Sequence, residues 1–427
     1  MLEILLRIGR KIIPKKIFNF FQPAYHYTLS LLGAIVYRFP SKHIYVIFVT
    51  GTKGKTSTIE LINAILEEAG YKTALASTLR FKTKQKNLPN KMKMTSPGRF
   101  FLQSFLRTAV KEKCDYAIIE MTSEAAKQFR HRFIDFNCLV FTNLSPEHIE
   151  SHGSYENYKQ AKLEIARALL KSQKKERIII ANADDSEGSK FLDIKVEKKI
   201  PYSLEKVASF DLKKDGISIK TKKLEIHSSL IGKFNAYNIL AACAFAETQD
   251  IKSETIKKAI EEFSSIPGRM EKINEEQNFS VIVDYAHTAD SLKQVYETLG
   301  DVKKICILGS AGGGRDKWKR PEMGKIAKKY CHKIILTNED PYDEDPMQII
   351  NDVAEGIGSS GYKVILDRRE AISFGLREAK RGYSVIITGK GTDPYIMGKN
   401  GSKVPWSDAS IAKEELNKIL HSKKRGS

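Results

Sequence analysis

The chain of 427 residues has little cysteine, and its cysteines do not form the patterns of a disulfide-rich or zinc-binding protein. There are five, an odd number, at positions 114, 138, 243, 306 and 331, and none belongs to a CxxC pair. Disulfide frameworks and structural zinc sites need paired, regularly spaced cysteines. We therefore expect five reduced thiols and a cytoplasmic protein.

The chain also lacks a long apolar run. Near the N-terminus, the longest uncharged apolar stretch covers residues 27–37, which is short of the ~20 residues that a membrane-spanning helix needs. No small-residue cleavage site follows it, so we expect no signal peptide. Residues 1–40 are nevertheless basic, aromatic and apolar. Two interpretations stay open: helices that pack on the following domain, or a peripheral anchor at the inner face of the membrane.

Acidic residues are in deficit: 51 Asp and Glu stand against 71 Lys and Arg, for a formal charge of +20. Such a surplus favours an anionic partner, which could be a nucleotide, a phosphorylated substrate, nucleic acid or an acidic membrane. The sequence contains no recognised nucleic-acid-binding module, so we expect no nucleic acid partner. With 41% hydrophobic residues the chain can bury real cores.

Short β-rich runs alternate with helical patterns along most of the chain, which predicts an α/β fold with mostly parallel sheets. One series of strands is expected at 44–49, 115–120, 137–142 and 177–181. After residue 266 a second series is expected at 281–284, 304–308, 333–336, 363–366 and 384–388. Residues 195–228 are Lys-rich, and we interpret them as a small β excursion.

This organisation predicts three parts. Residues 1–43 would form a short, basic and apolar helical arm. Residues 44–265 would form a central ATP-binding domain of the P-loop type. Residues 266–427 would form a Rossmann-like C-terminal domain.

A glycine-rich turn lies between the first strand and a helical pattern that ends at Gly70. Its residues are Gly51, Thr52, Lys53, Gly54, Lys55, Thr56 and Ser57. Glycines let consecutive backbone N–H groups face a phosphate, and the helix N-terminus adds partial positive charge. Lys55 can reach the β- and γ-phosphates of ATP, and Thr56 can bind Mg²⁺. Position 49, a glycine in the full P-loop pattern, is Val49 here, so this is the shorter TGTxGKT variant.

Glu120 ends the expected strand 115–120, at the edge of the sheet where ligands of α/β proteins bind. Mg²⁺ prefers oxygen ligands, usually one or two carboxylates together with phosphate and water. We therefore predict that Glu120 is a Mg²⁺ ligand.

Several motifs together resemble the Mur ligases, most of all the UDP-N-acetylmuramoyl-tripeptide synthetases, from residue 44 to residue 408. They are TGTKGKTS (50–57), EMTS (120–123), FTNLSPEHIESHGSYENYKQAK (141–162), NADD (182–185), GKFNAYNILAA (232–242), PGRME (267–271), DYAHT (284–288), GSAGGGRDKWKRPEM (309–323) and GKGTDPY (389–395).

The resemblance implies an ATP-dependent ligase that activates a carboxylate as an acyl phosphate and couples it to an amino acid in cell-wall precursor synthesis. It implies ATP and two Mg²⁺ ions as cofactors, and a nucleotide, an anionic muropeptide-like substrate and an amino acid as partners. His148 would bind the second metal, and Lys162 would be carbamylated. Asn235 and Asn238 would lie near adenine, Arg269 at the phosphates and Asp284 at the ribose. The substrate-binding residues would be Thr95, Ser96, Ser123, Arg315, Glu339, Asp340, Gly389 and Asp393.

Three departures from the family pattern bear on the substrate. About 43 residues precede the first strand, too few for the usual UDP-binding domain. Tyr342 stands where diaminopimelate-adding members carry arginine, which disfavours meso-diaminopimelate. Asp393 stands where the family has glutamate. A Mur-like ligase with a non-UDP acceptor and a non-catalytic nucleotide-binding module therefore remain alternatives.

Overall fold

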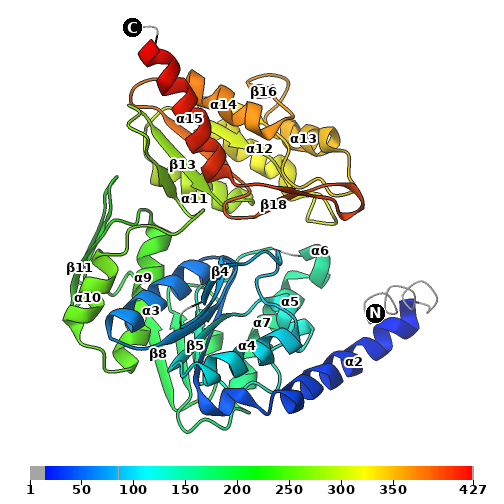
Figure 1. Ribbon diagram of the computed structural model, residues 1–427, viewed down its shortest axis with the longest axis vertical. Helices are drawn as coiled ribbons and strands as arrows, with labels where there is room; N and C mark the ends of the chain where they lie inside the picture. The colour runs from blue at the N-terminus through cyan, green and yellow to red at the C-terminus, as the bar shows by residue number, and fades with distance from the viewer. Residues whose placement is uncertain (1–14, 85, 148, 426–427) are drawn as a thin grey trace. The chain divides into compact units, whose positions relative to one another are not determined.

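The computed structural model describes residues 15–84, 86–147 and 149–425, which form two compact units (Figure 1). Unit 1 contains residues up to Ser145, Glu156–Glu205 and Leu240–Lys252. Unit 2 contains Pro146–Tyr155, Lys206–Ile239 and the chain from Ser253 onwards. The division of the sequence at residues 43 and 265 stays a prediction.

Unit 1 is built on an eight-stranded sheet of order β4-β3-β2-β5-β1-β6-β7-β8. Strands β2, β5, β1, β6, β7 and β8 run parallel, while β3 and β4 add an antiparallel edge. The bounds are β1 Tyr45–Thr50, β2 Thr73–Ala76, β3 Arg80–Thr83, β4 Lys86–Pro89, β5 Tyr116–Glu120, β6 Cys138–Phe141, β7 Ile178–Asn182 and β8 Lys198–Tyr202. The predicted parallel α/β architecture is confirmed, since runs of buried apolar residues form these central strands.

Helices cover this sheet, and one further helix leads into it. The sheet helices are α3 Lys55–Glu68, α4 Arg99–Lys111, α5 Ser123–Lys127, α7 Tyr155–Leu169, α8 Gly188–Leu192 and the end of α9 Lys233–Thr248. The arm contains α2 Lys15–Val36 and a 3₁₀ turn, η1 Pro40–His43. Helix α2 packs on α4. Among the described residues, no helix has the length and apolar content to span a bilayer.

Unit 2 is a three-layer structure around a six-stranded sheet of order β12-β13-β17-β14-β15-β16, in which only β12 is antiparallel. The strands are β12 Glu271–Ile273, β13 Ser280–Asp284, β14 Lys304–Leu308, β15 Lys333–Leu336, β16 Tyr362–Val364 and β17 Ser384–Thr388. One face carries α11 Ala289–Thr298, α12 Lys319–Tyr330 and α13 Pro346–Glu355, and the other carries α14 Arg368–Glu378 and α15 Asp408–Arg425. This is the predicted Rossmann-like fold.

The β excursion expected at 195–228 is only partly right. Strands β9 Ser209–Leu212, β10 Ile217–Lys220 and β11 Glu225–Ser228 form a separate antiparallel sheet, next to α10 Ser253–Glu261. Residues 198–202, however, pair in parallel with β7 and extend the large sheet. The Lys-rich composition hid this because β8 is an edge strand, where exposed charged side chains are typical.

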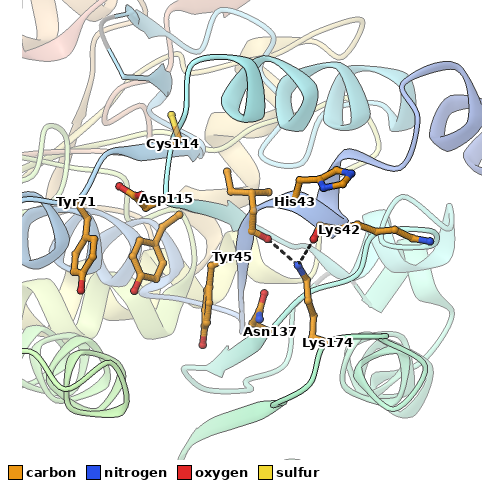
Figure 2. A pocket seen from close by; sticks show the side chains of 10 residues that line it. Lys42, His43, Tyr45, Tyr71, Cys114, Asp115, Asn137 and Lys174 are labelled. Atoms are coloured by element: carbon orange, nitrogen blue, oxygen red, sulfur yellow. Dashed lines mark hydrogen bonds between the residues drawn. The ribbon is translucent and has the colours of Figure 1, made fainter.

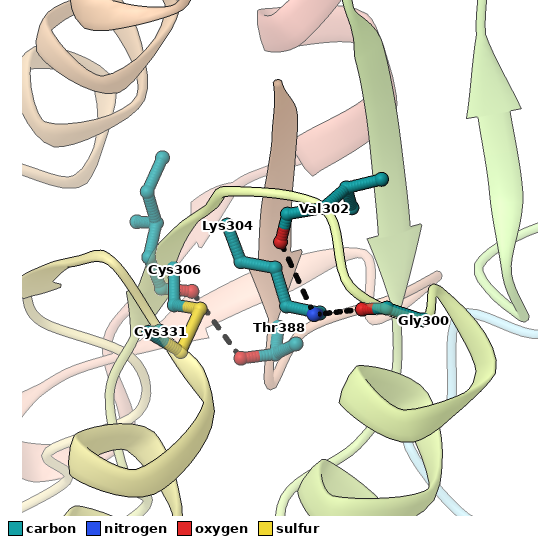
Figure 3. Close-up of a disulfide and its surroundings, with 7 residues drawn as sticks. Gly300, Val302, Lys304, Cys306, Cys331 and Thr388 are labelled. Carbon is teal, nitrogen blue, oxygen red and sulfur yellow. Dashed lines mark hydrogen bonds between the residues drawn. A yellow bond between two sulfur atoms is a disulfide. The ribbon is translucent and has the colours of Figure 1, made fainter. Parts of the chain in front are cut away.

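The expectation of five reduced thiols is wrong for one pair. Cys306 and Cys331 form a disulfide, while Cys114, Cys138 and Cys243 are free and buried (Figure 3). Cys306 lies on β14, and Cys331 lies between α12 and β15, the strand that pairs with β14. This pairing brings the two Cα atoms to 6.0 Å, an ordinary spacing for a disulfide. The sequence gap of 25 residues gave no sign of it.

A buried ion pair ties the carboxyl end of the unit 2 sheet to α15. The Arg368 guanidinium donates to both carboxylate oxygens of Asp408, at 2.8 and 2.7 Å, and also to the carbonyl oxygens of Asn338 and Thr388. Both side chains are at most 1% exposed. The pair therefore connects the ends of β15 and β17, where the candidate site residues of this unit begin.

We expect Asp408→Ala to lower the free energy of unfolding by about 3–5 kcal/mol, because it leaves the Arg368 charge buried and unpaired. Urea unfolding followed by circular dichroism measures this loss. Glu414→Ala, which removes an exposed partner of Arg369, is the control and should cost less than about 1 kcal/mol. Equal losses in both variants would contradict the structural role given to the pair.

Candidate active site

The glycine-rich turn forms a tight loop between β1 and α3. Gly51 has φ +148° and Gly54 has φ +78°, values that L side chains rarely adopt. A Cβ atom on Gly51 would also lie 1.9 Å from Thr142 Oγ1, so only glycine fits there. The Lys55 Nζ donates to the carbonyl oxygens of Gly51 at 3.1 Å and Thr52 at 2.8 Å. The ammonium group is thus held at the loop that would receive phosphate.

Two residues after β6 clamp this loop, and sequence reasoning did not single them out. The Asn143 side chain accepts from the Lys53 amide and donates to the Lys53 carbonyl oxygen, both at 3.0 Å. Thr142 Oγ1 donates to the same carbonyl oxygen at 2.7 Å. Both residues lie in the quoted FTN motif, and β6 is the neighbour of β1 in the sheet. Their position directly after a strand was the available signal.

Oxygen atoms gather around Glu120 at the carboxyl end of β5. Thr56 Oγ1 donates to Glu120 Oε1 at 2.9 Å, and the Thr78 amide and hydroxyl both contact Glu120 Oε2. Glu120 is 1% exposed. A buried carboxylate among hydroxyl groups is a donor set that suits a hard cation such as Mg²⁺. Thr78 was missed from the sequence because it follows a different strand, β2.

Lys162 reaches the same loop from α7. Its Nζ donates to the Gly51 carbonyl oxygen at 2.7 Å and lies 4.9 Å from the centre of the Tyr158 ring. The Tyr158 hydroxyl lies 3.0 Å from Thr52 Oγ1. Lys55 and Lys162 are 107 positions apart in the sequence (162 − 55), and the fold lets both donate to the Gly51 carbonyl oxygen.

His148 lies outside the described residues, so its predicted role stays a prediction. Within 15–84, 86–147 and 149–425, no group of three or more His, Cys, Asp or Glu side chains could hold a metal.

The expected acceptor segment is directly connected to Glu120. Thr95 Oγ1 lies 3.0 Å from Thr78 Oγ1, the hydroxyl that contacts Glu120. Ser96 Oγ donates to the Glu120 carbonyl oxygen at 2.8 Å and accepts from the Thr122 amide at 3.0 Å. Ser123, also predicted to bind substrate, begins α5 and is buried. Unit 1 thus places the glycine-rich loop, the Glu120 carboxylate and the expected acceptor segment together.

In unit 2, Asp284 holds the turn that carries Arg269. Its carboxylate accepts from the Met270 and Ala286 amides, both at 2.7 Å, at the carboxyl end of β13. Burial raises the pKa of this carboxyl group. The Arg269 guanidinium lies 4.3 Å from the centre of the Tyr285 ring. Such stacking orients the cation without neutralising it.

The two asparagines predicted to lie near adenine are neighbours on α9. Asn235 Nδ2 donates to the Ile231 carbonyl oxygen at 2.9 Å, and Asn238 Nδ2 donates to Asn235 Oδ1 at 3.0 Å. Both side chains are buried. The structure therefore brings them together, within a hydrogen-bonded pair.

Two of the three predicted substrate-binding carboxylates, Asp340 and Asp393, share one lysine partner. The buried Lys390 ammonium lies 2.8 Å from Asp340 Oδ1 and 3.4 Å from Asp393 Oδ2. Asp340 also accepts from the Met397 amide, on the short strand β18 Tyr395–Met397, which pairs with β19 Lys403–Pro405. The Lys390 ammonium group thus forms ion pairs with both Asp340 and Asp393.

Glu339 is the exception. It is 4% exposed, and in the described part of the chain its Oε2 atom has no hydrogen-bond partner. A Cβ atom on Gly389 would lie 2.3 Å from this oxygen, so the glycine makes room for the carboxylate. Burial raises the pKa of Glu339. A buried carboxylate oxygen without a donor is a ready partner for an ammonium group of a ligand.

The basic loop 309–318, which leads into α12, lies beside this carboxylate. A Cβ atom on Gly309 would lie 3.0 Å from the Glu339 Cβ, and a Cβ atom on Gly313 would lie 2.6 Å from the Tyr342 ring. Arg315 is exposed in the same loop. Tyr342 therefore packs its ring on the loop and supplies no charge there.

A separate hollow lies at the amino ends of the parallel strands of the unit 1 sheet, opposite the end that carries the glycine-rich loop (Figure 2). Its walls include Tyr45, Tyr116 and Asn137, at or just before the amino ends of β1, β5 and β6. Lys174 Nζ donates there to the Ser41 and Ile44 carbonyl oxygens, at 2.7 and 2.9 Å. None of the predicted site residues lines this hollow, so it is distinct from the phosphate loop.

Comparison with known proteins gives consistent matches along the chain. The family model described as Mur ligase middle domain matches residues 49–246, and that described as Mur ligase, glutamate ligase domain matches residues 268–391. The chain is 38% identical over 404 residues to the UDP-N-acetylmuramoyl-L-alanyl-D-glutamate–2,6-diaminopimelate ligase of Syntrophomonas wolfei, covering 91% of this chain and 81% of that one. The enzyme of the same name from Aquifex aeolicus is also 38% identical, with the same coverage.

A solved structure of a diaminopimelate ligase of that name is 28% identical, with a TM-score of 0.60, and covers 88% of this chain and 79% of its own. The fold, the phosphate loop and these matches agree along most of the sequence. The chain therefore belongs to the Mur ligase family, whose members are ATP-dependent ligases that form amide bonds.

Proposed function

We propose that the protein adds an amino acid to a muramoyl-peptide-like carboxylate in cell-wall precursor synthesis. The observation that supports this most strongly is the link between Thr56, Glu120 and Ser96, which joins the phosphate loop to the expected acceptor segment. Relatives at 38% identity are named as ligases of UDP-N-acetylmuramoyl-L-alanyl-D-glutamate.

The chemistry needs a good leaving group, because an amine cannot displace oxide from a carboxylate. Transfer of the γ-phosphate from ATP to the carboxylate oxygen makes an acyl phosphate, and ADP leaves. The amine then attacks the carbonyl carbon, loses a proton, and inorganic phosphate leaves as the amide forms. The protein's main task is to hold several anions together and offset their charge. Lys55 and Arg269 suit that task.

Thr56 and Glu120 would hold Mg²⁺, which neutralises phosphate charge when bound. We propose that Lys162 is carbamylated in the working enzyme, which would turn its cation into a carboxylate-like ligand for a second Mg²⁺ together with His148. Asn235, Asn238 and Asp284 would contact the nucleoside. Support for the carbamate is positional: Lys162 lies on the phosphate loop and is 2% exposed.

For the incoming amino acid, we propose that Glu339 binds an ammonium group. Asp340 and Asp393 already face Lys390, so Glu339 is the carboxylate left for a ligand. Tyr342 lacks the positive charge that would bind a second carboxylate. The expected amine is therefore lysine or another diamine, whereas the named relatives use 2,6-diaminopimelate.

Glu339→Gln should raise the KM for the amino acid about tenfold or more, because the amide cannot pair with an ammonium group. The KM for ATP should change little. Steady-state kinetics with saturating ATP and acceptor measures this. Glu355→Gln, an exposed change at the end of α13, is the matched control. An unchanged amino acid KM in Glu339→Gln would remove the assignment.

The proposed function is tested by phosphate release from ATP and Mg²⁺ with a matrix of acceptors and amines, and by mass analysis of the products. We expect turnover with UDP-muramoyl-dipeptide and one amine, with lysine ahead of diaminopimelate. Turnover only with another carboxylate would identify a Mur-like ligase with a non-UDP acceptor. ATP binding without turnover on any acceptor would identify a nucleotide-binding module instead.

We propose a cytoplasmic location with peripheral contact at the inner face of the membrane through residues 1–40. Their apolar and basic composition supports this. No nucleic acid partner is proposed.

A further inference from the structure

The outer face of α2 is apolar and exposed. From Asn19 to Val36 the chain contains no Asp, Glu, Lys or Arg. Six large apolar side chains on this stretch are nevertheless in contact with solvent: Phe20 (78% exposed), Phe21 (61%), Tyr27 (47%), Leu32 (44%), Ile35 (52%) and Val36 (62%). The water-facing side of a helix normally carries charged residues, so a face of this kind indicates an interaction surface.

The opposite face fixes the helix to unit 1. His26, Ser30 and Ala34 are buried at helical spacing, and Ser30 Oγ donates to the Phe129 carbonyl oxygen at 2.8 Å. A Cβ atom on Gly33 would lie 3.7 Å from the backbone of Arg99, at the start of α4. Figure 1 shows the N-terminal half of α2 projecting beyond the rest of this unit. The apolar face is therefore held outward by packing on the other side.

In the sequence, basic residues come both before and after the exposed apolar stretch of this helix. Within residues 1–16 the sequence has five Lys and Arg against one Glu, and Arg38 and Lys42 are exposed just after the helix. Cations around an apolar helix match an anionic lipid surface, where the rings enter the headgroup boundary and the charges meet phosphate. They do not match a second copy of this chain, since the same positive ends would face each other.

The helix also touches the acceptor region. The Arg99 guanidinium, four residues after Thr95, donates to His26 Nδ1 at 2.6 Å and to the Gln128 carbonyl oxygen at 3.1 Å. Arg130, in the same turn as Gln128, donates to the Ser96 carbonyl oxygen. The buried side of α2 thus lies a few hydrogen bonds from the segment expected to hold the acceptor carboxylate.

We propose that α2 lies in the surface of an anionic bilayer and that the acceptor is a membrane-anchored muropeptide, an amphiphile with a lipid tail and an anionic headgroup. The second part rests on the proposed function. The reaction is unchanged: the acceptor carboxylate is phosphorylated by ATP and the amine displaces phosphate. What α2 adds is the location of the acceptor segment, at the bilayer surface where such a substrate resides.

The first arm of the test is co-sedimentation with vesicles of phosphatidylcholine, with and without phosphatidylglycerol. We expect binding to the anionic vesicles and a loss of about 100-fold in partitioning for Phe20→Ser/Phe21→Ser, because two aromatic rings no longer enter the lipid. Phe210→Ser/Leu212→Ser, which changes two side chains exposed on β9, is the control and should bind like the unchanged protein. Equal binding of all three proteins, or none by any, would overturn the proposal.

The second arm compares kcat/KM for muramoyl-dipeptide carried on UDP with that for the same dipeptide carried on polyprenyl diphosphate in anionic vesicles. We expect a preference for the vesicle-borne acceptor that Phe20→Ser/Phe21→Ser loses, while its turnover of the soluble acceptor is kept. Equal use of both acceptors by the unchanged protein would overturn the membrane-anchored acceptor. Failure on both acceptors would count against the proposed function, and the first arm would still decide the bilayer contact.

Sedimentation velocity without lipid tests whether a second copy of the chain, instead of a bilayer, binds the apolar face of α2. A monomer is expected for the unchanged protein and for the Phe20→Ser/Phe21→Ser variant. A dimer that this variant dissociates would show that a second copy covers the α2 face, and would overturn the proposal.

Discussion

Lys55→Ala is expected to reduce ATP-dependent phosphate release about 1000-fold, the scale of losing one charged or hydrogen-bonding group that stabilises a transition state. The Lys55 Nζ atom donates to the Gly51 and Thr52 carbonyl oxygens, in the loop that we propose binds phosphate. In the transition state for phosphoryl transfer, negative charge spreads over the γ-phosphate oxygens, and a positioned ammonium group offsets it. Loss of the group should therefore lower kcat more than it weakens ATP binding.

The matched control for this variant is Lys53→Ala. The loop is held through the backbone N–H and carbonyl groups of Lys53, which Asn143 contacts, so removal of its side chain should leave the loop in place. Single-turnover phosphate release gives the rates, and circular dichroism checks that both variants fold. Turnover of Lys55→Ala within a few-fold of the unchanged protein would show that the phosphate loop has another role.

Lys162→Ala is expected to lose about 100-fold or more in kcat, with partial recovery when short carboxylic acids such as acetate or formate are added. If Lys162 is carbamylated, the missing group is a carboxylate near the second metal, and a small free carboxylate can replace it. If the unmodified ammonium group only holds the Gly51 carbonyl oxygen, an added carboxylate has nothing to replace. Recovery by carboxylates thus separates the two roles.

Lys159→Ala is the control for this experiment, since Lys159 lies nearly one turn earlier on α7 and pairs with Glu156 and Glu187. It should keep turnover within a few-fold and show no response to carboxylates. Phosphate release at several acetate concentrations measures both effects, with removal of dissolved CO₂ as a further check on the unchanged protein. Lys162→Ala kinetics like those of the unchanged protein would exclude the carbamate.

Local pattern was enough to predict most strands and the phosphate loop. Strands such as 304–308 and 384–388 contain continuous apolar runs, at 305–308 and 385–387, because both faces of a parallel sheet are covered. The loop was recognisable because its backbone leaves little choice of residue: Gly51 has no space for a Cβ atom, and Gly54 has a positive φ. Where the backbone geometry accepts only one type of residue, as at these glycines, a single sequence is enough to recognise the loop.

Composition misled where long-range contacts decide the structure. The scattered cysteines predicted free thiols, but adjacent strands join Cys306 to Cys331. The Lys-rich segment 198–202 was assigned to a separate excursion, but it pairs with β7 at the edge of the large sheet. Strand order is set by packing of the whole unit, so neither outcome could be found in the local sequence.

The sequence by itself determined the family, the α/β architecture and the phosphate loop, because these depend on residue periodicity and on glycines with no alternative. Only the tertiary structure decided which groups meet. It placed Thr78 at Glu120, brought Lys162 to the Gly51 carbonyl oxygen and gave Asp340 and Asp393 a shared lysine, while Glu339 Oε2 receives no hydrogen bond from the residues that the structure describes. The physical reason is that such contacts join residues from different strands and helices. Whether these residues lie close together depends on the order of the strands within the sheet.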